Sequence, residues 1–167
     1  KNGKFVLSWA YHPKALPLAV PASTLNMAAL RGMHVTILRP NEFQLPASVM
    51  DKARLIASDT GAKIEETSEI HEAMSDANII YAKSWVSPSY YENLEEENKI
   101  RSKYKNWCIS DSWFREAKKS CRFMHCLPVR RGVVVDDSVL DGSRSIVISE
   151  AKNRLLVQMA ILHTLLK

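Results

Sequence analysis

FVLSWAYHPKALPLAVPASTLNMAALRGMHVTIL, residues 5–38, contains one complete strand–helix–strand unit. The apolar run at 5–10 predicts a hydrophobic strand. Residues 21–31 predict a helix, because Pro21 lies in its first turn and Gly32 follows its last residue. The β-branched segment HVTIL at 34–38 predicts a second strand. A strand, a crossover helix and a strand in this order indicate a parallel pair.

The rest of the chain continues the same alternation of strands and helices. We expect further strands at 63–66, 78–82, 122–127 and briefly at 146–148. We expect helices at 48–58 (stopped by Gly61), 68–77 (capped by Ser68), 111–119 and 150–167, and a loop at 84–107 with a helical part near 98–106. The pattern predicts an α/β fold, a doubly wound, Rossmann-like parallel sheet with helices on both faces. Ligands of such sheets bind beyond the carboxyl ends of the strands.

Composition and charge exclude several classes of protein. The 167 residues are 46% hydrophobic and 25% charged, and no apolar run is long enough to cross a bilayer. The net charge of +5 comes from scattered lysines and arginines, which argues against nucleic-acid binding and fits anionic small ligands or an acidic partner. The three cysteines (Cys108, Cys121, Cys126) show no disulfide or zinc spacing, so we expect a cytoplasmic protein without a metal. No glycine-rich phosphate loop is present, and we expect no cofactor.

Polar residues follow three of the predicted strands. His12 comes after the first strand, Lys83 after NIIYA at 78–82, and His125 and Cys126 at the end of the strand from 122. Taken singly, each is better explained as a solvated loop residue or as part of a packed core. Together they predict a cleft at the carboxyl edge of the sheet.

The residue types at this edge suit particular chemical roles. Lys83 and Arg130 are cations suited to a carboxylate or a phosphate. His125 would donate a hydrogen bond to a carbonyl oxygen or move a proton, and Cys126 would be a nucleophile only if its thiolate is favoured. Pro128 is expected to hold Leu127 extended, which would leave the carbonyls of Cys126 and Leu127 free to accept from an amine.

Four motifs spread over nearly the whole chain resemble a known family. WAYHPK at 9–14, AKSW at 82–85, FMHCLPVRR at 123–131 and SEAKNR at 149–154 are similar to transcarbamylases of the aspartate/ornithine family, and among them to the N-acylornithine branch. Ordinary ornithine enzymes carry Asp-Thr-Trp and a Ser-Met-Gly loop where this chain has Lys83-Ser84-Trp85 and no Ser-Met-Gly. Acylation removes the α-ammonium of ornithine, so a lysine suits the remaining carboxylate and an aspartate would repel it.

The resemblance implies carbamoyl transfer from carbamoyl phosphate to the δ-amine of an N-acylated ornithine, in arginine biosynthesis. It implies catalytic roles for His125, Cys126 and Arg154, amino-acid binding by His12, Lys83, Leu127 and Arg130, and carbamoyl-phosphate binding by Cys126, Leu127 and Arg154. In this interpretation His125 and Arg154 donate to the developing oxyanion. Cys126 then orients the amine beside the Leu127 carbonyl and is not a covalent nucleophile, whereas Arg131 has no assigned role.

The family's phosphate-binding Ser-x-Arg-Thr motif is absent from the chain. Residues 1–167 are therefore interpreted as a single C-terminal, amino-acid-binding domain, inactive alone, whose last helix (150–167) packs on a missing N-terminal domain. The resemblance also implies a homotrimer for the full-length enzyme. In a subgroup of acetylornithine enzymes, a lysine a few residues after the HCLP motif is modified. This chain has Gly132-Val-Val-Val135 in that stretch, so no such modification is expected here. The alternatives are an ordinary ornithine carbamoyltransferase or a non-catalytic ligand-binding domain of the same fold. The sequence does not distinguish an acetyl from a succinyl group on the ornithine substrate.

Overall fold

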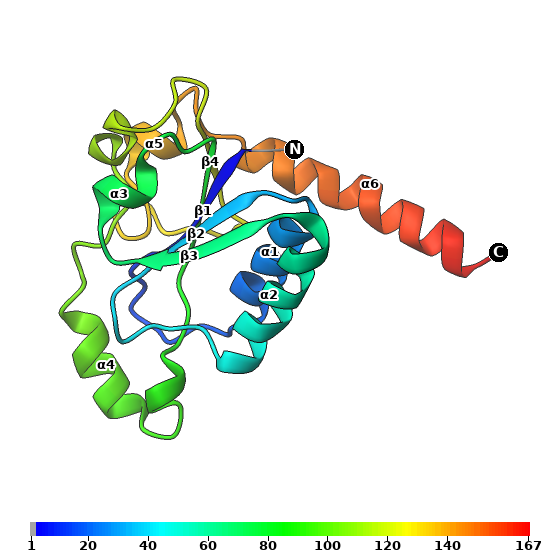
Figure 1. Ribbon diagram of the computed structural model, residues 1–167. Coiled ribbons are helices and arrows are strands. Elements are labelled where there is room, and N and C mark those ends of the chain that lie inside the picture. Colours follow the sequence, from blue (N-terminus) through cyan, green and yellow to red (C-terminus); the bar gives the residue numbers. More distant parts are fainter. Residues whose placement is uncertain (1–2) are drawn as a thin grey trace.

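The computed structural model describes residues 3–167 and is built on a five-stranded parallel sheet with strand order β3-β2-β1-β4-β5 (Figure 1). The strands are β1 (Lys4–Trp9), β2 (His34–Leu38), β3 (Lys63–Thr67), β4 (Ile79–Lys83) and β5 (Arg122–Met124). All four neighbouring pairs are parallel. The predicted doubly wound α/β fold is confirmed.

Helices cover both faces of the sheet. They are α1 (Ala19–Leu30), α2 (Ala47–Thr60), α3 (Ile70–Met74), α4 (Leu94–Ser102), α5 (Asp137–Leu140) and α6 (Val147–Leu165), with 3-10 turns η1 (Pro88–Tyr90) and η2 (Asp111–Arg115). Figure 1 shows α1 and α2 side by side against one face, with α3 and α5 on the other. Gly61 ends α2 in the left-handed region, with φ of 73°, as expected for a helix stopped by glycine.

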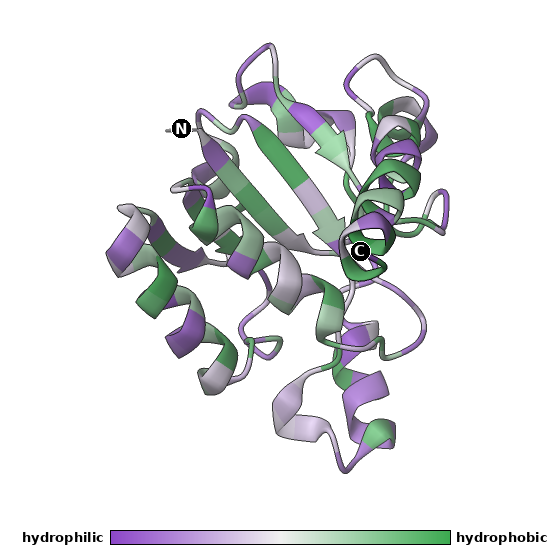
Figure 2. Ribbon diagram, turned by 90° about the vertical axis from the view of Figure 1, so that its right-hand side faces the viewer, coloured by the Kyte–Doolittle hydropathy of each residue, from purple (hydrophilic) through white to green (hydrophobic). Residues whose placement is uncertain are grey.

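The two cores follow from the alternation of side chains along the strands. Val6 and Ile80 point to the core under α3 and α5, whereas Phe5 and Leu7 point to the core under α1 and α2. Successive strand residues lie on opposite faces, so a strand covered on both sides is hydrophobic throughout. Figure 2 shows this as nearly continuous hydrophobic colour along the central strands.

The strand order reverses between β1 and β4. The chain runs outward from β1 through β2 to β3, and then returns to β4 on the other side of β1. Trp9 and Lys83 are register partners at the carboxyl ends of these two strands. Connections leave such a switch point in opposite directions and open a crevice between them. His12 and Lys83 therefore flank the place where this fold binds ligands.

Three of the predicted helices have different bounds in the structure. Ser68 does not cap a helix, because α3 begins at Ile70 with Glu69 at its N-cap and no side-chain cap bond. The predicted helix near 98–106 lies at Leu94–Ser102, because the Asn93 side chain accepts from the Glu96 backbone N–H at 3.1 Å and caps it there. The predicted helix 111–119 is only the short 3-10 turn η2.

The strand predictions near the last helix also need correction. β5 ends at Met124, so His125, Cys126 and Leu127 lie outside the sheet. The brief strand at 146–148 is wrong: Val147 opens α6, and the backbone pairs with β5 only through an isolated bridge between Phe123 and Ser145. The last helix therefore starts three residues earlier than predicted.

Helix α6 projects from the body of the molecule (Figure 1). Of its residues only Val147 is buried. The predicted apolar stripe of Leu155, Met159, Leu162 and Leu166 is 57–82% exposed. Figure 2 shows hydrophobic residues along this helix. No helix within residues 3–167 meets the length and hydropathy needed to cross a membrane.

Candidate active site at the carboxyl ends of the strands

His125 is held in a defined orientation directly after β5. Its side chain is almost fully buried, and its Nδ1 lies 2.9 Å from the backbone N–H of Leu127, from which it accepts a hydrogen bond. The remaining ring proton of the neutral imidazole must then sit on Nε2. Burial lowers the pKa of His125 to about 4, and the charges of Lys83 and His12 act in the same direction. At neutral pH, His125 is therefore a neutral Nε2–H donor, which favours the first of its two predicted roles.

The segment after His125 leaves the sheet in a tight turn. Leu127 has a φ of 50°, and the Leu127–Pro128 peptide is cis. The expectation that Pro128 holds Leu127 extended is therefore wrong; the Leu127 N–H instead turns back to the His125 ring. Within residues 3–167 the carbonyls of Cys126 and Leu127 accept no hydrogen bond, as the sequence predicted. They stay available to a bound donor.

Arg154 and the Cys126–Leu127 segment share one pocket of about 430 Å³. Pro128 lines it from the loop, and Ala151, Leu155 and Gln158 line it from α6. The structure thus brings together the three residues to which the sequence assigned carbamoyl-phosphate binding. Arg154 itself is exposed and can reach a ligand in this pocket.

Three cationic side chains lie near His12, and one of them, Lys83, also lies near His125. Burial lowers the pKa of His12, a hydrogen bond with the Lys14 backbone opposes that shift, and the charges of Arg130, Arg101 and Lys83 lower the pKa further. In the part of the chain that is described, no carboxylate forms an ion pair with Lys83, Arg130 or Arg154. An anionic ligand fits such a group of cations.

The two neighbouring arginines have different surroundings. Arg131 is 2.8 Å from Asp137 and 2.6 Å from Asp141, and these contacts join the loop to α5. Its exposed guanidinium is thereby engaged within the chain. Arg130 is exposed and forms no ion pair with a carboxylate among residues 3–167, so its predicted role in binding the substrate stays a prediction.

Trp85 and Ser84 hydrogen-bond to other residues of the protein and thereby hold the segment after Lys83 in place. The Trp85 side chain is fully buried and donates to the Phe43 carbonyl at 2.8 Å. Ser84 accepts from Arg101 at 2.8 Å. Of the motif Lys83-Ser84-Trp85, only Lys83 remains for a ligand.

A buried ion pair supports the loop that carries His12 and the segment that follows Lys83. Glu97 and Arg101, one turn apart on α4, are 0% and 1% exposed and bonded to each other. Arg101 also donates to the Trp85 carbonyl at 3.0 Å and to the His12 carbonyl at 3.5 Å. Its guanidinium lies 5.5 Å from the centre of the Trp9 ring, a cation–π contact. The loops that carry His12 and Lys83 are therefore tied to one buried cation.

The cysteines do not form a metal site. All three are free thiols, and no group of three or more potential ligand side chains is found among residues 3–167. Burial raises the pKa of the Cys108 thiol to about 12 and that of Cys121 to about 11.

Comparison with known proteins explains this arrangement. Residues 19–165 match the model of the aspartate/ornithine carbamoyltransferase Asp/Orn binding domain. The chain belongs to the aspartate/ornithine carbamoyltransferase family. It is 40% identical over 166 residues to N-acetylornithine carbamoyltransferase of Xylella fastidiosa (strain Temecula1 / ATCC 700964), which covers 99% of this chain and 49% of that protein. It is 39% identical over 140 residues to ornithine carbamoyltransferase of Oceanobacillus iheyensis, covering 83% of this chain and 42% of that protein.

Solved structures of carbamoyltransferases share the fold closely. Acetylornithine transcarbamylase complexed with acetylcitrulline is 38% identical, with a TM-score of 0.92 over 96% of this chain and 48% of that one. A mutant of N-acetyl-L-ornithine transcarbamylase complexed with carbamyl phosphate and N-succinyl-L-norvaline is 37% identical, with a TM-score of 0.94 over 97% of this chain and 49% of that one. The chain spans about half the length of the carbamoyltransferases it matches.

Several supporting residues of this carbamoyltransferase domain were not predicted from the sequence. Glu97 and Arg101 lie four residues apart in a charge-rich segment. Ion pairs with this spacing are also common on exposed helices, so the sequence does not reveal that this pair is buried. Tyr81 seemed only a core residue of NIIYA, and Glu150 only part of the helix opening. The SEAKNR motif was the one signal that could have drawn attention to Glu150.

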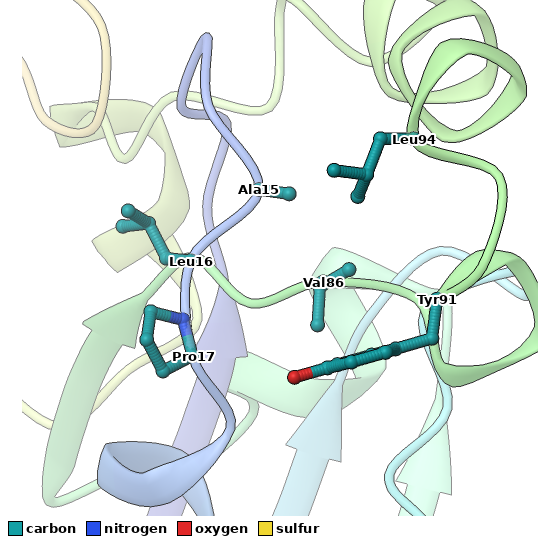
Figure 3. A pocket seen from close by; sticks show the side chains of 6 residues that line it. All are labelled: Ala15, Leu16, Pro17, Val86, Tyr91 and Leu94. Atoms are coloured by element: carbon teal, nitrogen blue, oxygen red, sulfur yellow. The ribbon is translucent and has the colours of Figure 1, made fainter.

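A second hollow lies on the same edge of the carbamoyltransferase domain. Ala15, Leu16 and Pro17 after β1 line it together with Val86, Tyr91 and Leu94 after β4, and its volume is about 210 Å³. Figure 3 shows the Tyr91 ring lying across the floor below Val86, with its hydroxyl toward Pro17. No charged side chain lines this hollow, so it does not suit the carboxylate of an amino acid.

Proposed function

We propose that residues 1–167 form the amino-acid-binding half of a carbamoyltransferase that acts on an N-acylated L-ornithine. The full-length protein would transfer the carbamoyl group of carbamoyl phosphate to the δ-amine and release N-acylcitrulline and phosphate. One observation carries this proposal: the Lys83 ammonium and the His12 ring lie near the neutral Nε2–H donor of His125, and the Arg130 guanidinium lies near His12. The identity to N-acetylornithine carbamoyltransferases over nearly the whole chain supports it.

The proposed reaction uses each group at a stated atom. A neutral δ-amine attacks the carbonyl carbon of carbamoyl phosphate, and the carbonyl oxygen becomes an oxyanion. His125 Nε2–H and Arg154 donate to that oxygen, and their effect is largest in the transition state. The free carbonyls of Cys126 and Leu127 accept from the attacking amine and orient it. Cys126 then needs no covalent step. As the tetrahedral intermediate collapses, the C–O bond to phosphate breaks and the leaving phosphate takes up the proton that the δ-nitrogen gives up.

The amino-acid end of the substrate would be held by charge. Acylation leaves the α-carboxylate as the only charge at the α-carbon. Lys83 and Arg130 supply the matching cations, and the neutral His12 ring can add a hydrogen bond. An aspartate in place of Lys83 would instead match the α-ammonium of free ornithine. The charge of Lys83 therefore favours an N-acylated substrate, and kinetic comparison of N-acetylornithine with N-succinylornithine identifies the acyl group.

The remaining proposals concern the rest of the protein. We place carbamoyl-phosphate recognition partly in a second, N-terminal half, on which the exposed apolar side chains of α6 would pack. The chain alone is then expected to be inactive. A homotrimer, a cytoplasmic location and a role in arginine biosynthesis are proposed from the family resemblance.

A comparison of three amines tests the proposed function. We expect the full-length protein to carbamoylate N-acetylornithine or N-succinylornithine with a kcat/KM at least about 100-fold above that for free ornithine, since the charge requirements of the two sites are opposite. The measurement is product formation at equal carbamoyl phosphate. A preference for free ornithine would instead support an ordinary ornithine carbamoyltransferase, and turnover of none of the three would support a non-catalytic domain.

The neighbouring arginines give a matched pair of variants. Arg130→Ala is expected to raise KM for the N-acylornithine about 10- to 100-fold, because a charge-assisted contact to the carboxylate is lost. Arg131→Ala removes the same side chain next to it, but that side chain is engaged with Asp137 and Asp141. We expect it to leave KM within about twofold. Equal effects of the two variants on KM would contradict the assignment of Arg130.

A further inference from the structure

Glu150 connects the last helix, α6, to the HCLP segment, residues 125–128. It lies one turn before Arg154 on α6, and its Oε2 accepts a hydrogen bond from the His125 backbone N–H at 3.1 Å. Among the α6 side chains in the described structure, Glu150 alone hydrogen-bonds to a residue outside the helix. Since only Val147 of this helix is buried, few other contacts fix α6 on the body.

Tyr81 lies beside the same carboxylate on the sheet side. Its side chain is almost fully buried, and its hydroxyl lies close to both Glu150 and the Cys126 thiol. Burial raises the pKa of the Tyr81 hydroxyl above its ordinary value, and the nearby Cys126 and Glu150 groups raise it further. Tyr81 therefore stays protonated and can donate. β4, the segment after β5, and α6 meet at these three side chains.

We propose that Glu150 is a positioning residue that sets the HCLP segment and α6 in register, so that His125 Nε2 and the Arg154 guanidinium reach the same oxygen. The proposal rests on the proposed carbamoyl transfer. The two donors come from different elements, one from the turn after β5 and one from α6. Glu150 is bonded to the backbone of the first and precedes the second by four residues, which places both side chains on one helix face. Loss of that bond would let the donors separate without removing either.

The test uses the full-length protein and four variants. Glu150→Ala is expected to lower kcat for the N-acylornithine about 10- to 100-fold, because small displacements of catalytic groups have effects of this size. KM should change about twofold or less, since Glu150 does not touch substrate. Glu150→Gln keeps an acceptor for the His125 amide and should retain kcat within about fivefold of wild type. Tyr81→Phe, which keeps the fold, should lower kcat about 2- to 10-fold. Glu95→Ala, at an exposed acid on α4, is the control and should keep kcat.

Hydrogen exchange separates failure of this inference from failure of the proposed function. Exchange in the peptide 123–131 should be faster in Glu150→Ala than in wild type, whether or not the protein transfers carbamoyl groups. A kcat of Glu150→Ala or Tyr81→Phe equal to wild type would overturn the inference, and so would unchanged exchange in that peptide. A Glu150→Gln variant as poor as Glu150→Ala would also overturn it, because the charge and not the hydrogen bond would then matter. Wild-type protein without any carbamoyl transfer refutes the proposed function, and exchange alone then decides whether Glu150 anchors the segment.

Discussion

Replacing His125 by alanine is expected to lower kcat for carbamoyl transfer about 100- to 1000-fold in the full-length enzyme. The Nε2–H donor that would stabilise the oxyanion is lost, and one such donor is typically worth about 2.7–4 kcal/mol of transition-state stabilisation. KM should change much less, because the bond strengthens as the charge develops. Steady-state kinetics with saturating carbamoyl phosphate measure both constants.

Two further variants give this experiment its controls. His125→Gln keeps an amide N–H near the position of Nε2, so it should retain more of kcat than His125→Ala. His34→Ala removes a partly exposed histidine that is paired with Glu65 at 2.8 Å on the far end of the sheet, and it should leave kcat unchanged. Normal turnover by His125→Ala would revive the interpretation of the chain as a non-catalytic ligand-binding domain.

Replacing Arg101 by alanine is expected to lower the free energy of unfolding by about 3–5 kcal/mol, because Glu97 is left buried without its partner. The loss should also loosen the loops that carry His12 and Lys83, since Arg101 bonds to the backbone of one and to Ser84 and Trp85 on the other. Denaturant unfolding can be followed by tryptophan fluorescence, because Trp9 lies against the Arg101 guanidinium.

The same helix supplies the control for this variant. Lys99→Ala removes an exposed cation of α4 that pairs with Glu95 at 3.2 Å, and such surface pairs are worth about 0–1 kcal/mol. Removing Glu97 and Arg101 together should cost less than the two single changes added, since neither charge is then left alone. An Arg101→Ala variant no less stable than Lys99→Ala would show that the buried pair does not support the loops.

The fold could be predicted because its strands and helices carry strong local signals. The β-branched segment at His34–Leu38 and the glycine after α2 act through the residues beside them. The wrongly predicted bounds of helices and strands lie where contacts between distant segments determine the secondary structure. Val147 opens a helix and does not extend a strand, because β5 pairs with this segment only at Ser145. The Asn93 cap of α4 was missed in a stretch without clear hydrophobic periodicity.

The residues of the site also differ in whether local sequence could predict them. Residues that end parallel strands meet at one edge by topology, so His12, Lys83 and His125 could be grouped from their order in the chain. The burial of Glu97 and Arg101 and the bond from His125 to Glu150 depend on how distant elements pack. The positive φ of Leu127 had no local signal either, because leucine rarely adopts it.

A structure of the full-length protein with N-acetylcitrulline bound tests most directly whether this rim is the amino-acid site. We expect the ligand's carboxylate within about 4 Å of Lys83 Nζ or the Arg130 guanidinium, the range of an ion pair. The ureido oxygen should accept from His125 Nε2, and the ureido nitrogen should donate to the Cys126 or Leu127 carbonyl. A ligand bound away from the 125–127 segment, or with its carboxylate remote from both cations, would contradict the account.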